Sequence, residues 1–286
     1  MTTTQIAIGL LITLCGIIKP ILYRPCAQYF PARISAVFTS IWLAIFTVAI
    51  FPFFGHLLID KLSEIFTSVF FVVSILRGIF LWAAIKYQQV VNKESTSSST
   101  FYTFISLSIA SLLNNLFFNE GLSINQILCI CGFGILGGIF FIIGDAKRLT
   151  TPAKTAFIIA MFCTAFSSVS DHLVNSSLGW YPQLFISSIT LLILSLLSGV
   201  SQQDLKNIFL NKTNVIAGIF YAFMDFLLVF TSVNIMPVSF VSVFHRSSVP
   251  IVMLISAFIY REQNWKNQLI FGISAFTLAL ILMFSK

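Results

Sequence analysis

Apolar residues fill this chain in long runs that are separated by short polar stretches. One membrane-crossing helix needs about 20 mainly apolar residues, and the runs have that length. Ten such segments are predicted, at residues 5–29, 33–54, 65–88, 98–118, 123–144, 153–172, 182–200, 214–235, 238–259 and 266–285. The longest connections, at 92–99, 144–154 and 198–213, are too short to hold a soluble domain. The pattern predicts an all-α polytopic membrane protein with ten transmembrane helices.

The composition favours the same interpretation. Hydrophobic residues make up 58% of the chain and charged residues 9%, with a mean hydropathy of +0.98, whereas a soluble domain carries roughly 25% charged residues. The net charge of +7 is spread over scattered Lys and Arg residues rather than a basic arm. Scattered charges of this kind orient membrane proteins or lie inside the membrane for function. We therefore expect a lipid bilayer around the chain and no nucleic-acid partner.

The chain also divides into two similar halves, residues 1–144 and 145–286, which together form one transmembrane domain. Aligned at an offset of 142 residues, the halves share five identities: Val91 with Val233, Ser106 with Ser248, Glu120 with Glu262, Asn125 with Asn267, and Gln126 with Gln268. Each half holds five predicted helices. Because five is an odd number, the second repeat is expected to be inverted relative to the first, as in many secondary transporters.

Each half closes with a short apolar helix, a Glu, a polar turn and a further apolar helix. These pieces, Leu116–Gln126 and Phe258–Gln268, resemble the drug/metabolite transporter superfamily, specifically the EamA-type ten-helix transporters. The family usually shows Gly-Glu where this sequence has Asn119-Glu120 and Arg261-Glu262, and often Trp-Gly where it has Cys15-Gly16. The resemblance implies two inverted five-helix repeats and transport of a small metabolite.

Basic residues predict an orientation. The odd-numbered connections carry nine of them, whereas the other side carries only Lys61 and Lys286. The nine are Arg33, Lys93, Lys147, Arg148, Lys154, Lys206, Lys212, Arg261 and Lys266. The positive-inside rule then places the odd-numbered connections in the cytoplasm and both termini outside. The family resemblance implies the opposite orientation, and we favour the one that the residues of this chain predict.

Two charges interrupt predicted segments at similar depth. Arg77 in SILRGIFLW and Asp225 in YAFMDFLLV each lie about twelve residues into the third and eighth segments. A charge at the bilayer centre costs about 3 kcal/mol on insertion scales, so it tends to face the bundle interior and to serve function. We expect both residues to line the substrate path, as partners of each other or as ligands for a zwitterion. The alternative is a permanent structural ion pair.

Further candidate substrate-binding residues are cationic or aromatic. Arg246 is favoured over its neighbour His245 for facing the cavity, because adjacent helical residues point about 100° apart, and His245 is a candidate proton-responsive group. Lys19 and Arg24 lie on a Pro-containing first segment that is typical of a gate or cavity lining. Trp82 and Tyr221 are candidates for stacking on a ligand, although in a chain with 15% aromatic residues most rings face lipid.

Other polar residues favour structural roles. Asp171-His172 closes the sixth segment, Lys86 is expected to anchor a helix end, and Glu120 and Glu262 are expected to hold loops. A polar stripe in the fourth segment is expected to join helices through hydrogen bonds: Ser106, Ser111, Asn114 and Asn115. The five Cys residues do not have the spacing of a zinc site, so neither a metal nor another cofactor is predicted.

The function that these patterns favour is secondary active transport by alternating access. No Walker A sequence is present, so energy would come from a gradient, through a proton or an exchanged metabolite. The predicted substrate is an amino acid or related zwitterion or organic anion. The alternatives are a membrane-embedded transferase and a channel. We expect a multi-pass protein of a bacterial inner (plasma) membrane that acts as a monomer or homodimer and is not an enzyme.

Overall fold

The computed structural model describes residues 2–118, 123–175, 177–236, 238–260 and 265–284, and nearly all of these are helical. Glu120 and Glu262 lie outside the described residues. The long helices are α1 (Thr3–Tyr29), α2 (Ala32–Ala49), α5 (Val69–Glu94), α6 (Thr96–Phe118), α7 (Ile124–Ile143), α8 (Thr151–Asn175), α9 (Trp180–Leu197), α11 (Lys212–Asn234), α12 (Val238–Ile259) and α13 (Trp265–Phe284). The shorter elements are α3 (Phe51–Ile59), α4 (Leu62–Thr67), η1 (Asp145–Arg148) and α10 (Gln202–Leu210).

Seven of these helices are long and apolar enough to cross a membrane: α1, α5, α6, α7, α8, α9 and α11. The bent pair α2–α3 makes eight if it counts as one span, and α12 holds a shorter apolar stretch, Phe244–Ile259. Large apolar side chains such as Leu10, Leu116 and Ile142 are exposed on the outside of the bundle. An exterior of this kind is solvated by lipid, so these features are those of an all-helical integral membrane protein.

The second predicted segment, 33–54, does not form one straight helix. The chain bends by 83° between Ile34–Ala49 and Phe51–Ile59. Pro52 lies at the start of α3, and because proline has no amide hydrogen it cannot continue the hydrogen bonding of α2, whereas the first turn of a new helix tolerates it. The bend carries α3 away from the bundle axis.

Polar caps mark where several helices begin. Ser123 and Gln126 form a reciprocal capping box at the start of α7, and Ser201 and Asp204 form another at the start of α10. The side chain of Asn211 accepts hydrogen bonds from the first amides of α11. These side chains satisfy amides that have no partner inside the helix, and they explain why α10 forms within a stretch predicted to be only a connection.

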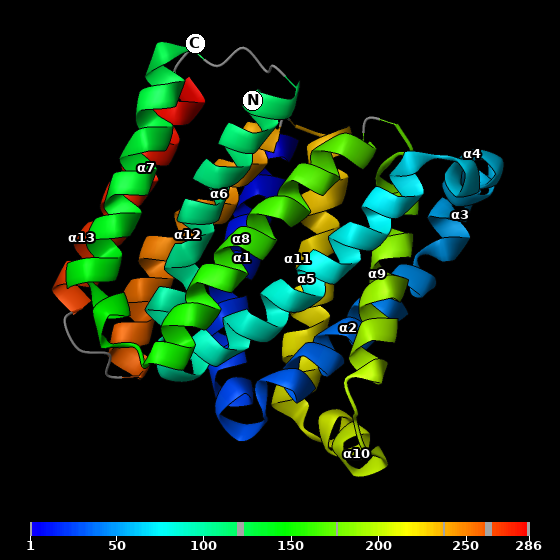
Figure 1. The fold of residues 1–286 in the computed structure, drawn as a ribbon, viewed down its shortest axis with the longest axis horizontal. Coiled ribbons are helices and arrows are strands. Elements are labelled where there is room, and N and C mark those ends of the chain that lie inside the picture. The colour runs from blue at the N-terminus through cyan, green and yellow to red at the C-terminus, as the bar shows by residue number, and fades with distance from the viewer. Residues whose placement is uncertain (1, 119–122, 176, 237, 261–264, 285–286) are drawn as a thin grey trace.

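The two ends of the bundle differ in their connections. The α1–α2, α5–α6 and α7–α8 connections lie at the lower end in Figure 1, and so does α10. The α8–α9 turn, α3 and α4 lie at the upper end, where α1 begins and α13 ends (Figure 1). Elements η1 and α10, which both carry basic residues, therefore lie at the same end of the bundle.

Helix α5 lies at the centre of the bundle. It packs against α8 and α9 and also contacts α1, α2 and α6. Helix α11 packs against α1 and α2 and contacts α9, α10 and α12. Helices α7 and α13 pack together at the side opposite to α3 and α4 (Figure 1). The buried interior therefore lies around α5 and α11, which carry Arg77 and Asp225.

Candidate functional site

Arg77 lies at the centre of a buried charge cluster. Its side chain is 2% exposed and contacts three other helices. Its Nε donates to Oδ1 of Asp171 on α8 at 2.7 Å, and its Nη1 donates to Oγ of Ser187 on α9 at 2.8 Å. Its Nη2 lies 3.6 Å from Oδ2 of Asp225 on α11. One cation is thus held between two carboxylates, and we call Arg77, Asp171, Asp225, Ser187 and Gln183 the charge cluster.

The two carboxylates of the charge cluster are held differently. Besides the Arg77 contact, Oδ1 of Asp171 accepts a hydrogen bond from Nε2 of Gln183 at 2.9 Å. Oδ2 of Asp225 is buried and accepts no hydrogen bond from the described residues. Charge-assisted hydrogen bonds between N and O are normally about 2.7–2.9 Å long. Asp171 therefore binds Arg77 directly, whereas Asp225 faces it across a longer gap.

Close helix packing positions this cluster. A Cβ atom added at Gly78 would lie 2.7 Å from Cβ of Thr190 and 2.8 Å from the carbonyl oxygen of Ser187. Only glycine allows α5 and α9 to approach this closely. Gly78 follows Arg77 in the sequence, so the same close approach brings the guanidinium within reach of Ser187.

A second cation lies next to the charge cluster. Nζ of Lys19 on α1 lies 4.4 Å from the ring centroid of Tyr221. Tyr221 precedes Asp225 by one turn of α11. The structure thus brings together four of the predicted site residues, namely Lys19, Arg77, Tyr221 and Asp225, with side chains of both signs.

The other predicted residues lie around this centre. His245, on α12, lies against Gly16 of α1, and Arg246 beside it is 9% exposed. Arg24 lies nearer the lower end of α1, where its Nη1 donates to Oγ1 of Thr96 at 3.3 Å and its Nη2 to the Glu94 carbonyl oxygen at 3.4 Å. These contacts connect α1 to the junction of α5 and α6.

An aromatic layer lies on the lower side of the charge cluster. Four rings belong to one packed cluster: Tyr23, Trp42, Trp82 and Tyr221. The ring centroids of Tyr23 and Tyr221 are 5.9 Å apart, and the hydroxyl groups of Tyr23 and Thr39 lie 2.7 Å apart. The Trp42 indole fits against the backbone of Gly218, where any side chain would overlap it. Nζ of Lys86 lies 4.8 Å from the Trp82 ring.

Three buried polar residues lie on the same helix faces as the aromatic layer, and we call Ser35, Gln89 and Asn214 the lower polar group. Gln89 follows Trp82 and Ile85 on α5 at helical spacing, and Asn214 precedes Ala217 and Tyr221 on α11. Gln89 is 1% exposed and Asn214 0%. The hydroxyl of Ser35 and both amide atoms of Gln89 and of Asn214 make no hydrogen bond to the described residues. The indole nitrogens of Trp42 and Trp82 likewise make no hydrogen bond to the described residues.

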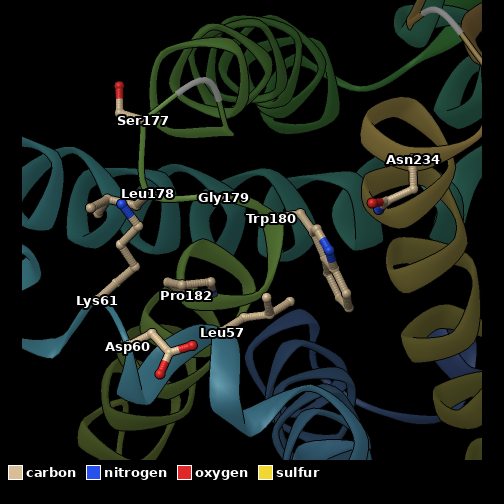
Figure 2. Close-up of a pocket in the computed structure, with 9 residues that line it drawn as sticks. All are labelled: Leu57, Asp60, Lys61, Ser177, Leu178, Gly179, Trp180, Pro182 and Asn234. Atoms are coloured by element: carbon tan, nitrogen blue, oxygen red, sulfur yellow. The ribbon is translucent and has the colours of Figure 1, made fainter.

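A separate pocket opens at the upper end of the bundle. It has a volume of about 400 Å³, and Figure 2 shows its lining from the α3–α4 corner, the α8–α9 turn and the end of α11. Asp60 and Lys61 bring opposite charges to it, and Trp180 and Asn234 line the other side (Figure 2). Nζ of Lys61 pairs with Oε2 of Glu64 at 2.8 Å. The size is within the range of small-ligand pockets, roughly 300–1,000 Å³.

Comparison of the sequence with protein-family models gives no match, and comparison with curated proteins gives none either.

Sequence reasoning selected Arg77, Asp225, Lys19 and Tyr221 but not the rest of the charge cluster. Asp171 was assigned to a helix end, and neither Gln183 nor Ser187 was considered. A signal for these two exists, because they lie four residues apart in a helix and so share one of its faces. Gln89 and Asn214 were also missed, although each is an amide within or beside a predicted segment.

Proposed function

We propose that this protein is a secondary active transporter that moves a small zwitterion, such as an amino acid, across its membrane by alternating access. The observation that carries the proposal is the buried Arg77 held between Asp171 and Asp225, three charges from three helices inside a membrane bundle. Ionisable groups inside membrane helices are costly, and they typically mark substrate or ion pathways.

The charge cluster offers both signs that a zwitterion needs. Asp225 faces Arg77 at 3.6 Å without a close hydrogen bond, so its carboxylate is available to an ammonium group. Lys19 lies over the Tyr221 ring at 4.4 Å and offers an ammonium to a substrate carboxylate. In the proposed transport cycle, the substrate competes with the internal partner Arg77 for contact with Asp225.

The helix neighbours support the proposed architecture of ten crossings in two inverted repeats. Residues 69–94, 96–118 and 124–143 of α5, α6 and α7 shift by 142 onto α11, α12 and α13 within about two residues at each end. The contacts pair in the same way, because α5–α8 corresponds to α11–α1, α5–α9 to α11–α2, and α1–α12 to α8–α6. Repeats of this type support membership of the drug/metabolite transporter superfamily, with the substrate bound between them.

The orientation belongs to the same proposal. The lower end, which carries η1 and α10 with their basic residues, would face the cytoplasm. The bacterial inner membrane is the proposed location. The coupling partner would be a proton or an exchanged metabolite, since a bundle of this kind works on a gradient.

Ligand binding tests this function. Purified protein is screened by thermal shift against amino acids, polyamines, nucleosides and organic acids, and each stabilising compound is then tested for counterflow in proteoliposomes. We expect the active compound to be a zwitterion that loses at least about tenfold in affinity in Asp225→Asn and in Arg77→Gln, since charged hydrogen bonds are worth roughly 1.5–3 kcal/mol. The control variant is Glu64→Gln, because Glu64 is an exposed carboxylate on α4. Wild-type affinity in both cluster variants would contradict the proposal.

A further inference from the structure

The lower polar group is costly to bury in the arrangement that the structure shows. Seven polar atoms of five residues, Ser35, Trp42, Trp82, Gln89 and Asn214, have no hydrogen-bond partner among the described residues. Most buried polar groups in proteins are paired. Seven unpaired atoms around one packed cluster therefore need an explanation other than stability.

These side chains follow continuous helix faces, and the face on α11 starts at the charge cluster. On α11 the face runs from Asp225 through Tyr221 and Gly218 to Asn214, in steps of three or four residues. On α5 a second face, which Arg77 does not share, runs from Gly78 through Trp82 and Ile85 to Gln89 in similar steps. Residues at these spacings lie on one side of a helix. Both faces lead toward the lower end, where α5 ends and α11 begins (Figure 1), and the α11 face leads there from Asp225.

The aromatic layer closes this route in the present arrangement. Tyr23 and Tyr221 lie ring to ring between Lys19 and the lower polar group, and Trp42 packs on Gly218. All of these contacts join different helices, so a separation of α1 and α2 from α11 would break them together. The same separation would let solvent or a ligand reach Gln89 and Asn214.

We infer that the lower polar group is the ligand-binding surface of a passage that is closed here, and that its amides, together with the indoles of Trp42 and Trp82, bind the polar part of a small solute. The chemistry differs from that of the charge cluster, because the groups are neutral and combine amide donors and acceptors with indole donors. Such a surface suits the carboxylate or amide groups of a solute and does not hold a buried ion pair. The role of this surface in transport rests on the proposed function. The opening of the passage does not depend on that function.

Isosteric apolar substitutions test the passage. Replacing an unpaired buried amide by a side chain of similar shape removes its desolvation cost from the closed arrangement. We expect Gln89→Met and Asn214→Leu each to raise the unfolding midpoint of the purified protein by about 2–4 °C. Gln88→Met is the matched control, because Gln88 is adjacent and its Nε2 donates to the Ser99 carbonyl oxygen at 3.3 Å. That variant is expected to leave the midpoint unchanged or lower.

Accessibility provides the second readout and needs no substrate. Ala217→Cys is placed in a variant whose five native cysteines are replaced by alanine, and an impermeant thiol reagent is applied from the lower side. We expect slow labelling that Gln89→Met slows by about tenfold, since it lowers the occupancy of the open arrangement. Unchanged labelling, or a lower midpoint in both Gln89→Met and Asn214→Leu, would overturn the inference. Either result is distinct from a failure of ligand binding at the charge cluster.

Discussion

Two sets of buried polar side chains share helices α5 and α11, and they differ in how they are paired. In the charge cluster Arg77 contacts two carboxylates and a hydroxyl. In the lower polar group, the side-chain amides of Gln89 and Asn214 make no hydrogen bond to the described residues. An unpaired buried polar group costs roughly 1–3 kcal/mol. The present packing therefore stabilises the charge cluster. The lower polar group gains hydrogen bonds only if the helices around it move apart.

The difference teaches how to interpret polar residues in membrane helices. Arg77 and Asp225 interrupt predicted apolar segments, whereas Gln89 and Asn214 lie at the ends of such segments. Their pairing separates a site that is assembled now from a surface that awaits another arrangement. Substitutions in each set should therefore change stability in opposite directions.

The largest effect is expected for Arg77→Gln. This change leaves the Asp171 and Asp225 carboxylates buried without their shared cation, and breaking a buried pair in this way costs about 3–5 kcal/mol. Chemical unfolding in detergent measures the loss. The double variant Arg77→Gln with Asp225→Asn removes one of the two stranded charges and should recover part of it. Equal unfolding of Arg77→Gln and wild type would show that the cluster does not stabilise the bundle.

A smaller effect should separate the two carboxylates. Asp171 accepts at 2.7 Å from Arg77 and at 2.9 Å from Gln183, so Asp171→Asn is expected to cost about 1.5–3 kcal/mol. Asp225 lies 3.6 Å from Arg77, and Asp225→Asn is expected to cost less. The same unfolding measurement compares them. If Asp225→Asn were the more destabilising change, Asp225 would hold the structure together rather than await a ligand.

The smallest effect of the three concerns the aromatic layer. Gly218→Ala would force Trp42 away from α11. Overpacking of this kind destabilises a protein by roughly 1–3 kcal/mol. The higher helix propensity of Ala offsets about 1 kcal/mol of this loss. Gly134→Ala is the control, because an added methyl there meets no atom within 4 Å. We expect the control to stabilise the protein and Gly218→Ala to destabilise it, as measured by their thermal midpoints.

The amino-acid pattern determined the fold class and several helix boundaries. Apolar runs of membrane-spanning length define the helices because lipid requires every backbone group to be satisfied within its own segment. The same rule made Arg77 and Asp225 conspicuous, since a charge inside such a run is costly. The bend after Ala49 was not predicted from the sequence, even though Pro52 is present there. Apolar character alone does not show where a helix changes direction.

Only the tertiary structure decided which polar groups meet. Asp171 is 94 residues from Arg77, and Ser187 is 110 residues away, so no local pattern connects them. The unpaired state of Gln89 and Asn214 is likewise invisible in the sequence, because a side chain lacks a partner only relative to the helices packed around it. Local composition sets the membrane environment of each segment, whereas hydrogen bonds and ion pairs between segments depend on three-dimensional distances of a few ångströms.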